Sequence, residues 1–111
     1  MTDENEPRKT LTDRTQIYPG HRETIKEGPR KGQQRDYVVL AQEEIDKGFV
    51  RPYRDAYRHL KCGTVTTMGR ALSETYARDP TFYGATFCCH CNRHLPVAEF
   101  VWTADGQQVG S

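Results

Sequence analysis

Two short cysteine-containing stretches constrain the fold of this chain more than any other feature. The first reads His59-Leu60-Lys61-Cys62-Gly63 and the second reads Cys88-Cys89-His90-Cys91-Asn92. Each places two metal-capable side chains three positions apart, followed by glycine or asparagine, the residue types that best tolerate a left-handed backbone. This pattern is typical of a zinc knuckle, a tight turn that presents two ligands. Because zinc takes four nitrogen or sulfur ligands in a tetrahedron, two facing knuckles complete one site.

The pattern predicts Cys62, Cys88 and Cys91 as three ligands of one structural Zn²⁺ ion. The fourth ligand has two candidates. His59 is preferred, because it takes the position of the first cysteine when the two stretches are compared. His94, three residues after Cys91, is the alternative, and the histidine that is not used is expected beside the site or on the surface.

The remaining cysteine and histidines receive no ligand role. Cys89 is interpreted as a partly buried free thiol, His90 as a solvent-facing residue of the turn, and His21 as part of a tail. A disulfide framework that pairs the two adjacent cysteines with the other two is the alternative for a secreted protein. The N-terminal residues contain no apolar signal segment, so a cytoplasmic location and metal ligation are favoured.

A site with four protein ligands has no open position for water or substrate, so the predicted site is structural rather than catalytic. The sequence contains no nucleophile elbow, phosphate-binding loop, dinucleotide-binding loop or base-deaminase motif. Glu74 and Glu99 are single carboxylates with no evident partner. The sequence thus leans against an enzyme. A hydrolase or nuclease would need three ligands, a zinc-bound water and a carboxylate base.

The overall charge does not identify a partner. The formal net charge is +1 and the pI is 7.7, below the value of about 9 expected of a dedicated nucleic-acid-binding domain. The longest apolar run, residues 37–41, is far shorter than the roughly 18 residues of a membrane helix. We therefore expect no membrane association.

The composition divides the chain into two parts. Residues 1–36 are predicted to be a disordered tail, because their few apolar side chains cannot offset the conformational entropy lost on ordering. Residues 37–111 are predicted to form a zinc-binding α+β domain. The fold class expected for it is a small zinc-ribbon-like, two-knuckle domain with one main helix and a C-terminal β-hairpin.

The expected elements follow from periodicity and turn residues. Apolar residues at helical spacing predict the main helix over about residues 68–78. The segment 53–60 is interpreted as a strand, with a helix beginning at Pro52 as the alternative. Asp105-Gly106, between two strand-prone runs, predicts the C-terminal hairpin.

Residues 47–61 interleave positive and aromatic side chains, which suits phosphate contacts and base stacking. In the alternative interpretation, the aromatic rings belong to the core and the arginines form a solvated face. The candidate nucleic-acid-binding residues are Lys47, Arg51, Tyr53, Arg54, Tyr57, Arg58 and Lys61.

The segment from Thr64 to Cys91 resembles small hypothetical proteins carried by phages and mobile elements. The likeness covers roughly residues 50–110 and includes the Cys-Gly knuckle, the motif Cys-x-x-Cys-x-x-His-x-Pro-Val and the Phe-x-Trp of the hairpin. The resemblance implies the cytoplasm of a bacterial cell or a phage-infected host, and it carries no established activity.

Three functions are compatible with these features. The first is a non-catalytic, zinc-stabilised binding module, a monomeric accessory or regulatory factor that acts through contacts with a protein partner. The second is nucleic-acid binding through the 47–61 face. The third is a zinc-dependent hydrolase or nuclease.

Overall fold

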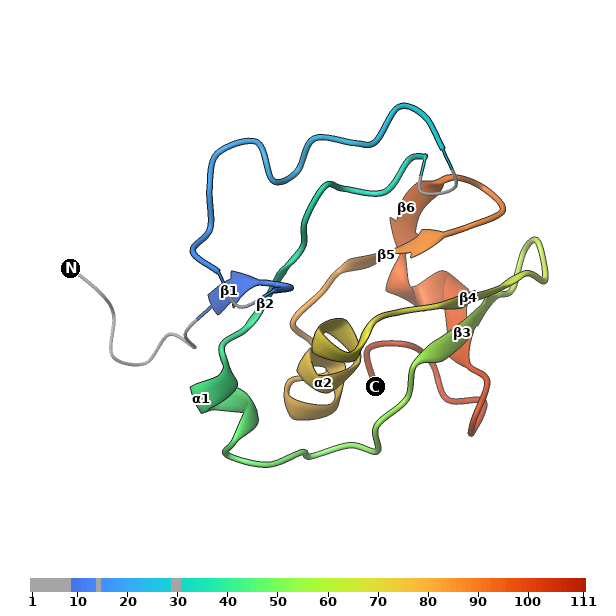
Figure 1. The fold of residues 1–111 in the computed structure, drawn as a ribbon. Helices are drawn as coiled ribbons and strands as arrows, with labels where there is room; N and C mark the ends of the chain where they lie inside the picture. Colours follow the sequence, from blue (N-terminus) through green and yellow to red (C-terminus); the bar gives the residue numbers. More distant parts are fainter. Residues whose placement is uncertain (1–8, 14, 29–30) are drawn as a thin grey trace.

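The computed structural model describes residues 9–13, 15–28 and 31–111 (Figure 1). This part of the chain is a small α+β fold with seven strands and one main helix, which confirms the predicted fold class at this level. The strands are β1 (Lys9–Leu11), β2 (Val38–Leu40), β3 (Ala56–His59), β4 (Val65–Thr67), β5 (Ala85–Cys88), β6 (Arg93–Pro96) and β7 (Phe100–Trp102). The helices are α1 (Gln42–Ile45), α2 (Arg70–Arg78) and the 3₁₀ turn η1 (Val97–Glu99). Within the described residues, no helix has the length and apolar content needed to cross a membrane.

The strands form three small antiparallel sheets. β1 pairs with β2, β5 pairs with β6, and β3 lies between β4 and β7 (Figure 1). Two of these pairings, β3–β4 and β5–β6, are hairpins whose turns contain the two cysteine stretches. Of residues 53–60, interpreted preferentially as a strand, Ala56–His59 form β3, whereas residues 53–55 lead into it without strand structure.

The C-terminal residues return along β7 over a short distance. The amide of Trp102 donates to the carbonyl of Gln107 at 2.8 Å, and Val101 and Gln108 form an isolated antiparallel bridge. On its other side β7 pairs with β3 over three residues. The residues after β7 form one bridge and a turn but no second strand, so the C-terminal β-hairpin remains a prediction, and the strand partner of β7 is β3.

The core is a cluster of aromatic rings that also contains a cysteine. Tyr57 and Phe100 meet edge to face at 5.3 Å between ring centroids, and Tyr76 of α2 meets Trp102 in the same way at 5.3 Å. Cys88 belongs to this buried cluster. Tyr76, which belongs to the apolar helix face that the sequence predicts, thus packs against the sheet that holds the first cysteine stretch.

The residues at the two ends of α2 explain where this helix begins and ends. Gly69 is the N-cap residue and makes no side-chain cap, although the hydroxyl of Ser73 donates back to its carbonyl at 3.0 Å. Asp79, which precedes Pro80, leaves the helical region with φ −138° and ψ 87°. Steric conflict with the proline ring disfavours helical geometry for the residue before it, so the helix ends there.

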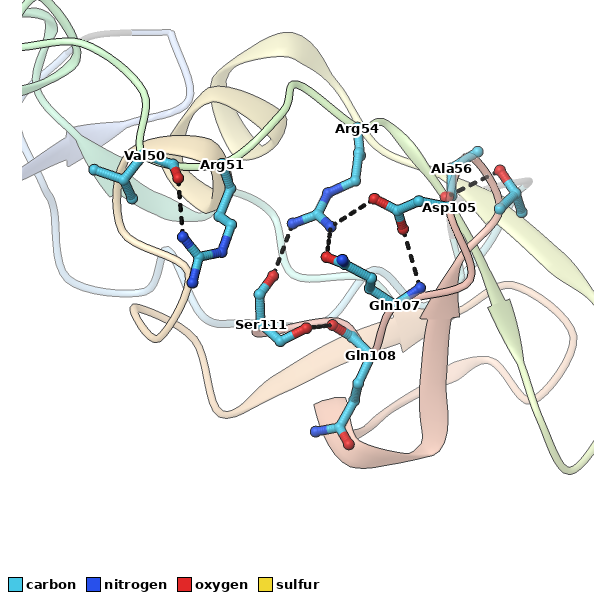
Figure 2. A network of polar contacts seen from close by, with 9 residues as sticks. Val50, Arg51, Arg54, Ala56, Asp105, Gln107, Gln108 and Ser111 are labelled. Carbon is cyan, nitrogen blue, oxygen red and sulfur yellow. Dashed lines mark hydrogen bonds and ion pairs between the residues drawn. The ribbon is translucent and has the colours of Figure 1, made fainter.

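Arg54 fastens the C-terminal residues to the entry of β3. Its side chain is buried and donates to Asp105 Oδ2 and Gln107 Oε1 at 3.1 Å each, and to the carbonyl of Ser111 at 2.8 Å (Figure 2). The guanidinium also lies 4.8 Å from the centroid of the Trp102 ring. The backbone N–H of Gln107, which donates a hydrogen bond to Asp105, is the main cause that holds the pKa of this carboxyl below its usual range. The hydrogen bond from Arg54 adds a smaller effect in the same direction. Arg54 is therefore part of the packed structure.

The described part of the N-terminal segment lies against this body. β1 pairs with β2, and Leu11 is 1% exposed. Between these strands the chain runs along one side of the molecule toward β6 and back (Figure 1). There, Gly32 contacts the backbone carbonyl of Asn92 in the second cysteine turn. The division of the chain at residue 36 and the disorder of residues 1–36 remain predictions, and residues 1–8, 14 and 29–30 lie outside the described residues.

Gly28 and Gly32 provide a matched test of this contact. Both adopt φ +90°, but a Cβ at Gly28 would meet nothing within 4 Å, whereas one at Gly32 would collide with Asn92. Gly28→Ala should cost only the backbone strain of about 1–3 kcal/mol. Gly32→Ala should in addition detach the segment, so the amide of Ile25 should exchange faster with deuterium while the amides of α2 stay protected. Equal exchange in the two variants would contradict the contact.

Candidate metal centre

The two cysteine stretches form equivalent turns. His59 is the last residue of β3 and Cys88 the last residue of β5. In each turn an amide four residues later donates back to the carbonyl of this first residue, from Gly63 to His59 at 2.7 Å and from Asn92 to Cys88 at 2.8 Å. Gly63 adopts φ +76° and Asn92 adopts φ +57°, the left-handed conformation expected of them. Each turn thereby directs two donor side chains to one side.

The donor atoms of the two turns converge. One ligand atom from each of His59, Cys62, Cys88 and Cys91 can be chosen so that all four lie within 4.8 Å of one another. His59 Nδ1 is 3.2 Å from the sulfur of Cys62 and 3.8 Å from that of Cys91, and the sulfurs of Cys62 and Cys88 are 3.6 Å apart. The cluster is compatible with binding a metal ion.

The structure brings His59, and not His94, to the three cysteines. His94 lies on β6, with Nε2 2.9 Å from the phenolic oxygen of Tyr37, and burial lowers its pKa. Both histidines lie near the end of a hairpin strand, but the side chain of His59 points toward the three thiols and that of His94 points toward Tyr37. That direction depends on the strand register, which the spacing of the sequence does not reveal.

The side chains without a predicted ligand role lie outside the cluster. Cys89 is exposed, with its sulfur 3.6 Å from the carbonyl of Val65, and His90 is also exposed. His21 is half-buried, and its Nδ1 has no hydrogen-bond partner among the described residues. All four cysteines are free thiols. The structure therefore contradicts the alternative of a disulfide framework among the four cysteines.

Glu99 orients the imidazole of His59. Its Oε1 lies 2.9 Å from His59 Nε2, while the other ring nitrogen points toward the sulfurs. The hydrogen bond raises the pKa of His59 and lowers that of Glu99. With the proton on Nε2 donated to the carboxylate, Nδ1 has a lone pair available for a metal, an arrangement common around metal-binding histidines.

Sequence reasoning left Glu99 without a partner. The two residues are 40 positions apart, and they meet because β3 pairs with β7, which places His59 opposite Phe100. A carboxylate immediately before a strand carries no local signal of this pairing. Only the strand register identifies it.

The thiols are unequally stabilised as anions. The backbone N–H of Thr64 lowers the pKa of Cys62 to about 6. Burial, followed by the neighbouring thiol of Cys88, raises the pKa of Cys91 to about 11. One thiolate is thus supported by the protein itself, whereas several thiolates crowded together require a cation between them.

The structure divides the predicted nucleic-acid-binding residues into two that are buried and five that are exposed. Tyr57 is 2% exposed and Arg54 is 4% exposed, so both belong to the interior and are not available to a nucleic acid. Of the exposed residues, Lys47 lies 3.0 Å from Glu44, and Lys61 lies 3.5 Å from Glu99. The predicted residues that are exposed are Lys47, Arg51, Tyr53, Arg58 and Lys61.

No protein-family model, curated protein or solved structure matches this chain. The resemblance to proteins of phages and mobile elements remains a hypothesis.

Glu99→Gln should weaken the affinity of the cluster for Zn²⁺ by about 10- to 100-fold, because the amide supports the imidazole less well than a carboxylate. Competition with a chromogenic chelator measures this affinity. Lys61→Gln is the control, since it removes the exposed ion pair with the same Glu99 oxygen and should leave the affinity nearly unchanged. Equal affinities of the Glu99 variant and the unmodified protein would contradict the orienting role.

Proposed function

We propose that this protein is a zinc-stabilised binding module without catalytic activity, a small accessory or regulatory factor that acts through contacts with another protein. The observation that carries the proposal is the convergence of four donors, one imidazole and three thiols, from two facing hairpin turns. We interpret this pair of turns as zinc-ribbon-like. Thiolate and imidazole ligands together favour zinc among the common divalent ions.

The donor separations support a tetrahedral ion of this size. Zinc–sulfur bonds of about 2.3 Å and zinc–nitrogen bonds of about 2.0–2.1 Å imply about 3.8 Å between sulfurs and about 3.6 Å between nitrogen and sulfur. The Cys62–Cys88 separation is 3.6 Å, and His59 Nδ1 lies 3.2 Å and 3.8 Å from the sulfurs of Cys62 and Cys91. Little rearrangement would be needed to close the tetrahedron.

A closed tetrahedron supports a structural role. Zinc hydrolases and nucleases keep one coordination position for water, whereas four protein donors occupy all positions. A hydrolytic function would need one of the four donors to leave the ion, and His59, the neutral donor, is buried and held by Glu99. We therefore place the hydrolase or nuclease interpretation last.

An exposed apolar strip supports the choice of a protein partner. Phe49, Val50 and Tyr53 are 46%, 53% and 45% exposed and lie within one irregular segment between α1 and β3. The amides of Val50 and Arg51 both donate to the carbonyl of Ala77, which holds this segment against the end of α2. Large exposed apolar side chains gathered in one place are typical of protein–protein contacts. The proposal also includes a monomeric state and a location in the cytoplasm. The reducing cytoplasm keeps zinc-binding thiols from forming disulfides.

Removal of zinc tests the proposal. We expect one zinc ion per chain by elemental analysis and loss of the native circular dichroism spectrum on chelation, because structural zinc supplies an apparent 10–16 kcal/mol, compared with about 3–5 kcal/mol from a small core. Cys88→Ser should behave like the chelated protein, and Cys89→Ser, which changes a thiol outside the cluster, like the native one. A native spectrum after complete removal of zinc would refute the stabilising role.

Nucleic-acid binding is the second candidate function. It is supported by the exposure of Arg51, Tyr53 and Arg58 along the segment that leads into β3 and along β3 itself. The burial of Arg54 and Tyr57 reduces the surface available to it.

Binding to single- and double-stranded oligonucleotides at increasing salt tests this second candidate. The affinity should fall with salt, and the double variant Arg51→Ala/Arg58→Ala should bind at least tenfold more weakly. The charge-matched control Arg22→Ala/Arg70→Ala removes two exposed arginines outside the 47–61 face. No binding at low salt, or equal losses in both variants, would exclude this interpretation.

A further inference from the structure

A cavity of about 260 Å³ lies between the N-terminal segment and the body of the protein. Residues 33 and 35–37 border it on one side, and α2 and the hairpin strands β4–β6 on the other. It is separate from the metal cluster, since none of the four converging donors borders it. The function proposed above does not use this cavity.

The wall of the cavity is mainly aromatic and aliphatic. Tyr37 comes from the N-terminal side, Met68 from the segment just before α2, Leu72 and Tyr76 from α2 itself, and Phe87 from β5. Binding sites for small molecules typically combine such walls with a few fixed polar groups. Aromatic walls of this kind favour a flat ligand that can stack on them.

A hydrogen-bonded pair supplies the polar edge. The amide of Gln34 donates to the phenolic oxygen of Tyr37 at 3.3 Å, so the phenolic hydrogen is available to His94 Nε2 at 2.9 Å. His94 then accepts at Nε2 and carries its own proton on Nδ1. Burial lowers the pKa of His94, which agrees with a neutral ring. The edge that borders the cavity is thus polar and uncharged.

The two charged residues at the cavity are engaged by other groups. Arg35 lies 3.3 Å from the carboxylate of Glu23. Asp36 accepts hydrogen bonds from the hydroxyls of Tyr18 at 2.6 Å and Thr12 at 3.4 Å. The two side chains carry opposite charges, so the lining has no net formal charge that would favour an ion. A neutral ligand is the one its surface matches.

The volume limits the size of the ligand. A cavity of about 150 Å³ holds benzene, so about 260 Å³ corresponds to roughly ten non-hydrogen atoms, the size of a fused bicyclic ring. We propose that the cavity between the N-terminal segment and α2 binds a small, neutral, planar bicyclic heteroaromatic compound, stacked between the aromatic walls, with its polar edge toward Tyr37 and His94. This binding activity is additional to the protein contacts proposed above.

Benzimidazole and the hydrocarbon indene, which have the same size, test the proposal on the zinc-loaded full chain. Benzimidazole should bind with a Kd below about 1 mM, as expected for a ligand of this size, and indene more weakly. The chain contains two methionines, Met1 and Met68. With both methyl groups labelled for NMR, saturable shifts should occur at Met68, which borders the cavity, and not at Met1. Absence of binding, or shifts that do not include Met68, would overturn the proposal.

Two variants locate the ligand. Leu72→Trp should fill the cavity and weaken benzimidazole binding at least tenfold, whereas Ala104→Trp, at an exposed position outside the cavity, should leave it unchanged. Tyr37→Phe should weaken benzimidazole about threefold or more and leave indene unaffected, since only the polar edge is altered. If Leu72→Trp does not fold, the Met68 measurement on the unmodified protein still decides. Undiminished binding to a folded Leu72→Trp variant would overturn the proposal.

Discussion

The convergence of four donor atoms from two hairpin turns is the constraint on which the rest of this structure depends. The two turns are more than 20 residues apart in the chain, and the sulfurs of Cys62 and Cys88 nevertheless lie 3.6 Å from each other. Cys88 belongs at the same time to the aromatic core, so the core and the cluster form one unit. The proximity of three thiols and one imidazole is compatible with metal binding.

The remaining elements attach to this unit through a few specific contacts. The pairing of β7 with β3 brings Glu99, the residue just before β7, to His59, while Arg54 holds the C-terminal residues beside Trp102. On the opposite side, Gly32 of the N-terminal segment touches the second turn at Asn92. Segments from both ends of the described chain therefore contact the two turns. The cavity beside α2 exists because the N-terminal segment forms one of its walls.

Much of the architecture could be predicted because its signals are local. The i, i+3 spacing of donors, the left-handed residues after them and the apolar periodicity of α2 each arise within a few residues. The partnership between His59 and Glu99 could not be predicted in this way, since it depends on the register of β3 against β7. The same holds for Arg54, whose spacing suits an exposed basic face but whose side chain is buried by the returning C-terminal segment. Local patterns state what a residue is able to do, and long-range pairing decides which neighbours it has.

The sequence by itself determined the chemistry of the site: three cysteines and a histidine in two knuckle-type turns, followed by residues that accept positive φ. It also determined the α+β class and the main helix, because backbone propensity and turn chemistry act over short distances. The tertiary structure alone decided that His59 rather than His94 faces the thiols, that Glu99 orients it, and that the N-terminal segment closes a cavity over α2. These outcomes depend on strand register and on contacts between distant segments, and a change of register by one residue turns a side chain to the opposite face of its sheet.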